Sequence, residues 1–489
     1  MAFGITPHSK EEIIPGEYSP EQLLALAWLA IEKAGWKTGH VSAGKVIAFT
    51  SASLNSWSEQ VTVQIEPGRV LIKSECVASQ LIDWGKNKKN TRLFVDTFEQ
   101  LKNGISREDL DAKFESLKSD PEFGTTGGWI QEGGPKDKVT GFLSIFKPIK
   151  GYFVTPVLLL VNIFIFVLMC LSGADVMQPD IGTLLSWGAN FRPSTLDGQW
   201  WRLLTCCFVH IGLIHLLMNM YALLYIGLLL EPLLGSPKFL LAYLLSGLTG
   251  SLLSLWWHDF TVCAGASGAI FGMYGVFLAL LTTNFVEKSA RGSLLSSILI
   301  FVVYNLMNGV KGNIDNAGHI GGLLGGLFIG YCYYPILKNP DSTSTRNTVM
   351  SSVSAVILLL SAIVCVSLDN DVMTYTKNME EFTVKEKAAL EIYNLPEGVN
   401  NKELAKKIRQ GIRTWYESLD IIKRSAKLKL PDLYARQIEL MQTYCLTRIN
   451  TYQAILKGLE EDTDKYDHVI EEYNKKTGEI LQELELLNK

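Results

Sequence analysis

Seven long apolar stretches are the feature that most restricts how this chain can fold. Each is roughly 17–21 residues long, which suits an α-helix crossing about 30 Å of hydrocarbon. The stretches are 152–172, 211–230, 238–257, 267–283, 294–310, 317–336 and 348–368. Because backbone polar groups inside a lipid bilayer must be hydrogen-bonded within the protein, such stretches are helical. The sequence therefore predicts a mainly α, polytopic membrane protein.

Polar segments lie on both sides of these stretches. The 489-residue chain is 48% hydrophobic, an average over polar ends and an apolar middle. The first segment combines helical periodicity with short runs rich in β-branched residues, which predicts a small α+β domain. The helical runs are 20–35, 91–104 and 107–118, and the strand-like runs are 46–50, 59–65 and 69–76.

The polar end of the chain after the last stretch is charged and helix-periodic, with breaks near Pro396 and Pro431. This pattern predicts a small helical bundle. A glycine-rich run precedes the first apolar stretch and predicts a linker. The expected domains are an N-terminal α+β domain at 1–120, a linker at 121–150, a membrane core at 151–340, a seventh span at 348–368 and a helical domain at 369–489.

Basic residues are distributed unevenly between the apolar stretches. They lie before the first stretch and after the second, fourth and sixth: Lys147, Lys150, Lys238, Lys288, Arg291, Lys338 and Arg346. The positive-inside rule makes those gaps cytoplasmic. Residues 1–150 are then cytoplasmic, and an odd number of spans places 369–489 outside the cell membrane. Residues 1–15 contain no signal-peptide core, so we expect the first span to direct insertion.

Composition excludes some classes of function. A net charge of -4 gives no indication of a nucleic-acid partner. The eight cysteines contain no CxxC pair and no closely spaced framework, so we interpret them as small apolar residues that fill the core.

Strongly polar side chains within the apolar stretches need a partner or a function, because their burial in lipid is costly. The segment HIGLIHLLMNM contains His210, His215 and Asn219. His215 and Asn219 are four residues apart and share one helix face. His210 is rotated from His215 by roughly 140° at 100° per residue, which places it at the mouth of the helix.

Two further polar residues begin apolar stretches on the same, outer side. Ser267 lies between Gly265-Ala266 and Gly268, and His319 opens a stretch that is rich in glycine. Small residues allow two membrane helices to approach closely. A serine hydroxyl becomes a useful nucleophile when a neighbouring base takes its proton. The sequence therefore predicts a Ser267–His319 pair that carries out acyl transfer.

Acyl transfer also needs hydrogen-bond donors for the negative charge that develops on the attacked oxygen. The backbone N–H of Ser267, at a helix start, has no intrahelical partner. His215 and Asn219 can supply further donors from a neighbouring span. Asp315, four residues before His319, is a weaker candidate for a carboxylate that orients the histidine.

Other interpretations of these residues fit less well. Glycines around a serine also arise from simple helix packing. An α/β-hydrolase needs G-x-S-x-G, but Ala269 occupies the last position. A zinc site at His210, His215 and His319 would lack both HExxH and a carboxylate at ligand spacing. A transporter would be expected to show inverted repeats with paired broken spans, and none are visible.

Several separated motifs together resemble the rhomboid family of intramembrane serine proteases. GQWWRLLTCCFVHIGLIHLLMNM is similar to its tryptophan-arginine loop followed by His-x4-His-x3-Asn, and GASG and GHIGGLLGG are similar to its serine and histidine motifs. The resemblance implies a six-helix core with Ser267 as nucleophile, His319 as general base and acid, and His215 and Asn219 as oxyanion donors. Supporting positions are His210, Gly265, Gly268, Trp201 and Arg202.

The resemblance covers about 150–340 and includes the extra span of the family's six-plus-one form. It does not reach 1–145 or 369–489. One departure is visible at Phe271, where many relatives have a tyrosine that packs against the catalytic histidine. A phenyl ring offers the same stacking surface without the hydroxyl.

These observations predict an endopeptidase that cuts transmembrane or juxtamembrane segments of other membrane proteins in the lipid bilayer. It would use a serine-histidine dyad with no metal, nucleotide or other cofactor. The alternative is a catalytically silent rhomboid-like protein that binds client helices. Such binders typically lack the serine or the histidine, and this chain has both.

Overall fold

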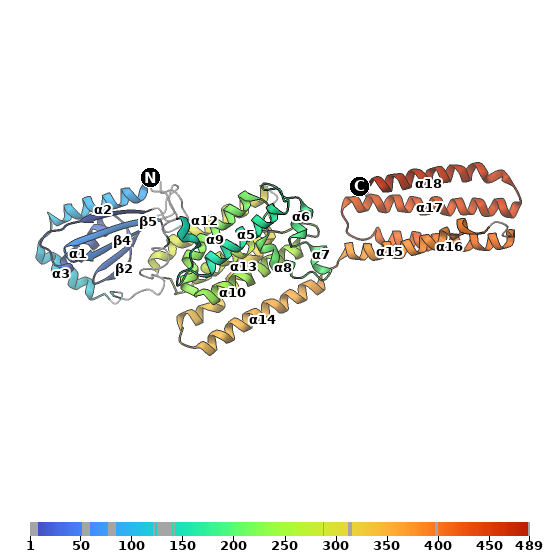
Figure 1. Cartoon of the computed structure of the whole chain (residues 1–489). Coiled ribbons are helices and arrows are strands. Elements are labelled where there is room, and N and C mark those ends of the chain that lie inside the picture. Colours follow the sequence, from blue (N-terminus) through green and yellow to red (C-terminus); the bar gives the residue numbers. More distant parts are fainter. Residues whose placement is uncertain are drawn as a thin grey trace. The chain divides into compact units, whose positions relative to one another are not determined.

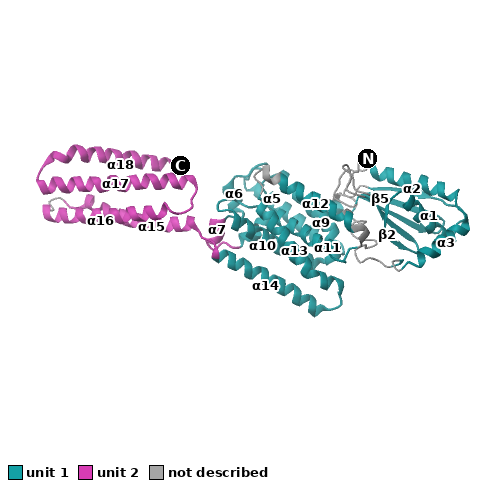
Figure 2. Ribbon diagram, turned by 180° about the vertical axis from the view of Figure 1, so that it is seen from behind, with its two compact units in different colours: residues 1–191, 201–366 teal, residues 192–200, 367–489 magenta. Residues whose placement is uncertain are grey.

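The computed structural model describes residues 8–487 apart from 51–58, 77–84, 121–122, 125–138, 140–141, 287, 312–314 and 397–399. The chain divides into two compact units, one within 1–191 and 201–366 and the other within 192–200 and 367–489 (Figure 2). Helices dominate both units, and several are long and apolar, so the prediction of a mainly α, polytopic protein is confirmed. Most of the predicted linker at 121–150 lies outside the described residues.

The N-terminal part contains an antiparallel sheet with helices packed against it (Figure 1). The strands are β1 (His8–Ile13), β2 (Lys37–Ser42), β3 (Lys45–Phe49), β4 (Glu59–Glu66) and β5 (Arg69–Cys76), in the spatial order β1-β5-β4-β3-β2. The helices are α1 (Pro20–Lys33), α2 (Lys86–Lys102) and α3 (Arg107–Lys118). Alternate residues of β4, including Val61 and Val63, are buried, as period-two patterning requires.

The sequence predicted the three strands β3, β4 and β5 but not β1 or β2. The two missed strands form the edges of the sheet, each with a single neighbouring strand. Strand β1 reads HSKEEI, and its charges suit an exposed edge, where they discourage pairing with another chain. Such a sequence gives little hydrophobic signal.

The membrane core follows, and each predicted apolar stretch corresponds to one helix. These helices are α5 (Val154–Leu171), α9 (Leu213–Leu234), α10 (Ser236–Trp257), α11 (Ser267–Thr282), α12 (Lys288–Lys311), α13 (Asn316–Lys338) and α14 (Thr343–Ser367). In the described part of the chain, five of them, α5, α9, α10, α13 and α14, are long and apolar enough to cross a membrane. Helix α11 and the apolar part of α12, Leu294–Met307, are shorter.

Short elements connect the core helices. They are η1 (Phe142–Phe146) before α5, then α6 (Ile181–Ser186), α7 (Arg192–Leu196), α8 (Arg202–Thr205) and η2 (Cys206–Phe208) between α5 and α9.

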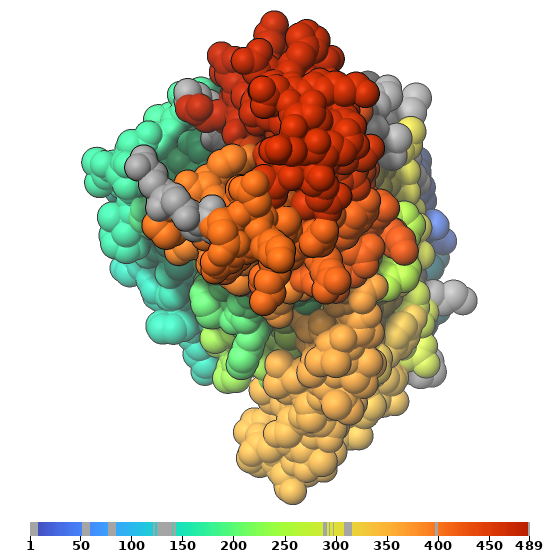
Figure 3. Space-filling model, turned by 90° about the vertical axis from the view of Figure 1, so that its right-hand side faces the viewer, coloured from blue at the N-terminus to red at the C-terminus, as the bar shows by residue number. Residues whose placement is uncertain are grey.

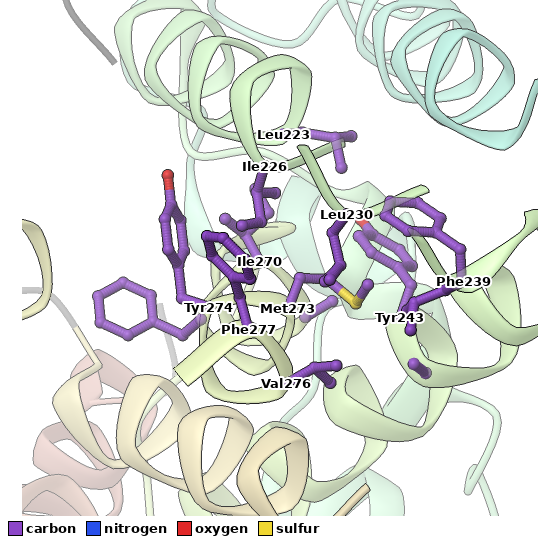
Figure 4. Packing of buried hydrophobic residues seen from close by; sticks show 14 of the residues in the cluster. Leu223, Ile226, Leu230, Phe239, Tyr243, Ile270, Met273, Tyr274, Val276 and Phe277 are labelled. Atoms are coloured by element: carbon purple, nitrogen blue, oxygen red, sulfur yellow. The ribbon is translucent and has the colours of Figure 1, made fainter. Parts of the chain in front are cut away.

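Helix α11 lies in the middle of the core. Most of its side chains are buried, and Figure 4 shows Met273, Tyr274 and Phe277 among residues of α9 and α10. Ile226 of α9 and Tyr243 of α10 belong to the same cluster and are fully buried. A helix enclosed by other helices does not need to match the full bilayer thickness, because its ends can meet protein or water instead of lipid.

A buried carboxylate ties α9 to the start of α5. Glu231 is 0% exposed and accepts hydrogen bonds from the backbone N–H groups of Phe153, Val154 and Thr155 at 2.7, 2.7 and 2.9 Å. The hydroxyls of Thr155 and Ser236 donate to the same carboxylate. Glu231 thus satisfies backbone donors that the first turn of a helix leaves unpaired. No sequence pattern predicted a role for Glu231.

Helix α14 packs loosely against the core. Val353, Ile357 and Ser361 are its buried residues, while Leu359 and Ile363 are more than half exposed. Its surface stands out in light orange in the space-filling view (Figure 3). An apolar exposed face of this kind suits contact with lipid.

The second unit contains a bundle of long helices. They are α15 (Asp371–Leu390), α16 (Asn401–Ser425), α17 (Asp432–Glu461) and α18 (Asp467–Leu487), with the short turns η3 (Glu391–Asn394) and η4 (Asp464–Tyr466) between them. The short helix α7 belongs to the same unit. The predicted breaks near Pro396 and Pro431 are confirmed. A further break follows Asp462, which has a positive φ of 50°.

Candidate active site

Ser267 is the first residue of α11, and a turn with a left-handed glycine precedes it. Gly265 has φ +128°, a conformation that residues with a Cβ rarely adopt. The backbone N–H of Gly265 donates to the carbonyl of Cys206 at 2.9 Å. This turn places Ser267 at the start of α11, where backbone N–H groups lack intrahelical acceptors.

His319 lies in the first turn of α13 and reaches the serine. Its Nε2 atom is 2.9 Å from Oγ of Ser267, a hydrogen-bond distance, and the residue is 7% exposed. The two residues, 52 positions apart in sequence, are thus in contact. In the described part of the chain, Nδ1 of His319 has no hydrogen-bond partner.

Glycines on both helices allow this contact. A Cβ atom placed on Gly322 would collide with the carbonyl oxygen of Gly268, and one on Gly326 would collide with that of Gly272. The backbones of α11 and α13 therefore touch directly along the helix faces that carry Ser267 and His319, as small residues permit.

A third helix packs against the same place. A Cβ on Gly250 of α10 would lie 2.7 Å from the carbonyl oxygen of Gly318 and 3.3 Å from Cα of Gly268. Gly250 thus lets α10 approach both α11 and α13. Gly250 was not among the predicted site residues, although the small residues in SGLTGS, 246–251, indicate close packing in the same way.

Phe271 stacks on the imidazole of His319. The two ring centroids are 4.2 Å apart and the ring planes differ by 4°. Phe271 lies one helical turn after Ser267 on α11, so the serine and the ring that supports the histidine share a helix face.

His215 and Asn219 of α9 face the turn before the serine. A Cβ on Gly265 would lie 2.6 Å from Cε1 and 3.0 Å from Nε2 of His215, and 3.7 Å from Nδ2 of Asn219. Nδ1 of His215 accepts a hydrogen bond from the backbone N–H of Ile211 at 3.3 Å. The ring proton of neutral His215 is then on Nε2, one of the two ring atoms that face Gly265.

His210 precedes α9 and is fully buried. Its ring centroid is 5.4 Å from that of His215, and neither ring nitrogen has a hydrogen-bond partner among the described residues. His210 thus lies beside His215, just before the start of α9.

The other residues of the sequence motif lie farther along the loop. Nη1 of Arg202 donates to the carbonyls of Leu185 and Ala189 at 2.6 and 2.9 Å, which holds the segment around α6. Trp201 is 57% exposed.

Asp315 does not orient His319 through a hydrogen bond to Nδ1. Its carboxylate instead caps α13 by accepting from the backbone N–H of Gly318 at 2.9 Å. Within the described residues, no group of three His, Cys, Asp or Glu side chains is placed to share a metal ion.

Comparison with known proteins identifies the family. Residues 197–336 match the Rhomboid domain model. Rhomboid protease GluP of Bacillus subtilis (strain 168) is 39% identical over 186 residues, 38% of this chain and 35% of the relative. RHOMBOID-like protein 5 of Arabidopsis thaliana is 37% identical over 158 residues, 32% of this chain and 51% of the relative.

A third relative is also similar. Rhomboid-like protease 3 of Toxoplasma gondii is 33% identical over 177 residues, 35% of this chain and 66% of the relative. The chain thus spans between a third and two thirds of the length of these relatives. Because each match also covers less than two fifths of this chain, the likeness concerns one part of it.

Proposed function

Because this chain belongs to the rhomboid family through residues 197–336, we propose that it is an intramembrane serine endopeptidase with a Ser267–His319 dyad. The observation that carries the proposal is the 2.9 Å distance between Ser267 Oγ and His319 Nε2. A serine within reach of a base that has a stacked partner is the arrangement that activates a hydroxyl for attack on a carbonyl.

In the proposed reaction, Oγ of Ser267 attacks the scissile carbonyl carbon while its proton passes to Nε2 of His319. The negative oxygen of the tetrahedral intermediate accepts hydrogen bonds from His215, Asn219 and the backbone N–H of Ser267. The imidazolium then gives its proton to the leaving amine. Water, deprotonated by the same histidine, releases the acyl group and restores the serine.

The substrates we propose are transmembrane or juxtamembrane segments that can unwind. A stable helix keeps its carbonyls in its own hydrogen bonds, so only an extended segment presents one to Ser267. Gly265 and Ala266 beside the serine imply a narrow pocket, which favours small or helix-breaking residues at the cleaved bond.

The core helices make this chain a multi-pass membrane protein. We propose that residues 1–150 are cytoplasmic and 369–489 extracytoplasmic, on the basis of the basic residues between the spans. The proposed domain boundaries are those expected from the sequence, with the rhomboid core at 151–340 and the seventh span at 348–368.

A fluorescent fluorophosphonate, which reacts covalently with activated serines, tests the dyad. We expect it to label the detergent-purified full chain, and we expect no labelling of Ser267→Ala or His319→Ala. The same variants should fail to cut a transmembrane reporter. A folded wild-type protein that neither labels nor cuts would overturn the proposal and favour a silent binder of membrane helices.

A further inference from the structure

The N-terminal end of the histidine helix is fixed by Asp315. Oδ1 of its carboxylate accepts from the N–H of Gly318 at 2.9 Å, and its carbonyl accepts from the N–H of His319 at 3.3 Å. Aspartate is among the best residues at this capping position, where it pairs an otherwise unsatisfied backbone donor. The conformation of Asp315 therefore sets the first turn of α13, and that turn holds His319.

A histidine from another helix faces the same carboxylate. His258 ends α10, and its Nε2 atom is 3.4 Å from Oδ1 of Asp315. The side chains are 31% and 13% exposed, respectively. Oδ2 of Asp315 is buried and has no hydrogen-bond partner among the described residues. A carboxylate with so little water and one unpaired oxygen is stabilised by a neighbouring hydrogen-bond donor, which an imidazole N–H of His258 can supply.

Other titratable groups lie around this pair. Cys263, in the segment that leads to Ser267, is near Asp315, and His319 interacts with the same carboxylate from its own helix. Asp259, the next residue after His258, is another charged group at this end of α10, and it has an interaction partner. The pair thus lies between α10, the serine turn and α13.

The helices joined by the pair are already in close contact. A Cβ on Gly321 of α13 would lie 2.6 Å from both Cβ of Leu253 and the carbonyl oxygen of Thr249 on α10. Because α10 and α13 are so closely packed, a displacement at the end of one helix is transmitted to the other. A shift at the Asp315 end of α13 therefore moves His319 relative to Ser267.

We propose that His258 and Asp315 are a positioning pair that joins the end of α10 to the start of α13 and holds His319 in reacting geometry against Ser267. This inference rests on the proposed function and adds to it two residues that do not touch the substrate. Errors of 1 Å in such geometry can cost about 10²-fold in rate, so a small displacement has a measurable effect.

The contact depends on the imidazole of His258. Replacement with glutamine keeps an amide donor but removes the ring, and replacement of Asp315 with asparagine keeps the cap but removes the carboxylate charge. Either change therefore alters the contact between α10 and α13 while leaving the residues of the proposed dyad in place.

The test measures fluorophosphonate labelling of the full chain and separates the maximal rate of inactivation from the probe's binding constant. We expect Asp315→Asn and His258→Gln each to lower the maximal rate by about ten-fold, with the binding constant little changed, because positioning acts on the reacting atoms. Asparagine still caps a helix, so Asp315→Asn should lower the melting temperature less than Asp315→Ala does.

A matched control is Asp180→Asn, which changes another capping aspartate, on α6, and should leave the labelling rate unaltered. The double variant of His258→Gln and Asp315→Asn should lose no more rate than either single variant, because both changes remove the same link. Unaltered maximal rates in both single variants would overturn the positioning pair.

The outcomes for the pair and for the proposed function are distinguishable. If the wild type never labels, the protease assignment falls, and with it the role of the pair in positioning a catalytic base. The contact between His258 and Asp315 is then judged by the melting temperatures of the same four proteins. Additive shifts would overturn the contact, and non-additive shifts would support it as a structural link alone.

Discussion

The ring of Phe271 lies parallel to the imidazole of His319, with centroids 4.2 Å apart and an angle of 4° between the planes. The stacked face limits rotation of the imidazole, whose Nδ1 has no hydrogen-bond partner among the described residues. Stacking of aromatic rings contributes about 0.5–1.5 kcal/mol beyond burial. In this chain, stacking on Phe271 therefore restricts the orientation of the base where an acidic hydrogen-bond partner would otherwise do so.

Phe271→Leu should accordingly reduce the rate of fluorophosphonate labelling by roughly five- to ten-fold, since about 1 kcal/mol of stacking is lost. Leucine fills much of the volume of the ring, which limits the loss of stability. Phe271→Tyr keeps the stacking surface and serves as the control, with labelling close to wild type. Equal rates for the leucine and wild-type proteins would show that the ring does not hold the imidazole.

The glycine contacts between α11 and α13 give a prediction about stability. Gly322→Ala places a methyl group against the carbonyl of Gly268, so the helices must move apart. Overpacking of this kind costs about 1–3 kcal/mol. We expect a lower melting temperature and a loss of labelling, because separation of the helices also separates Ser267 from His319.

The control for this prediction is Gly478→Ala on α18, where a Cβ would have no neighbour within 4 Å. Alanine in an open helical position should raise stability slightly, by about 0.5–1 kcal/mol. If both alanine variants raised the melting temperature, α11 and α13 would not be in direct backbone contact at Gly322.

The buried carboxylate of Glu231 leads to a third prediction. Glu231→Gln removes the charge and replaces one acceptor oxygen with a donor, which opposes the N–H groups at the start of α5. Loss of charge-assisted hydrogen bonds to buried donors should destabilise the chain by about 2–4 kcal/mol. Glu479→Gln, at an exposed position of α18, makes the same chemical change and should leave the melting temperature unaltered. A similar melting temperature for both variants would contradict this account of Glu231.

Sequence motifs predicted the placement of Ser267, His319, His215 and Asn219 because each motif is local and its residues have few other reasons to occur together. The seven apolar helices were equally predictable, since length and hydropathy determine them, but two of the seven predicted spans, α11 and the apolar part of α12, are shorter than a membrane-crossing helix. The residues that sequence reasoning missed act through distant partners. Gly250 allows close packing against Gly318, which is 68 positions away, and no local sequence pattern predicts that contact.

Asp315 shows a different limit. Its spacing from His319 made it a candidate for orienting the imidazole, but the same four-residue spacing also suits a helix cap. The structure shows the cap and adds His258, whose proximity depends on how α10 ends. Sequence spacing indicates that two groups are near each other, whereas the atoms they contact depend on packing.

Cys445 in the second unit predicts a dependence on alkaline pH. Burial, with Glu386 adding to its effect, raises the pKa of this thiol from 9.0 to about 12. Between these values the unfolded chain loses the thiol proton while the folded chain keeps it, so stability is full below pH 9 and falls as pH rises toward 12. Cys445→Ala removes the titration, and the fall in melting temperature over this range should be smaller than in the wild type. An equal fall in both proteins would assign the alkaline effect to other groups.

The orientation of the chain can be tested independently of catalysis. Basic residues between the spans predict that residues 1–150 and 369–489 lie on opposite sides of the membrane. Alkaline phosphatase folds only outside the cytoplasm, so its fusion after Lys489 should be active, and a fusion to the N-terminus should be inactive. Fusion of a fluorescent protein that matures only in the cytoplasm should give the reverse pattern. Activity of the phosphatase at neither end would mean an even number of spans. Because α11 and the apolar part of α12 are the shortest of the apolar helices, one of these two would then be the helix that does not cross the membrane.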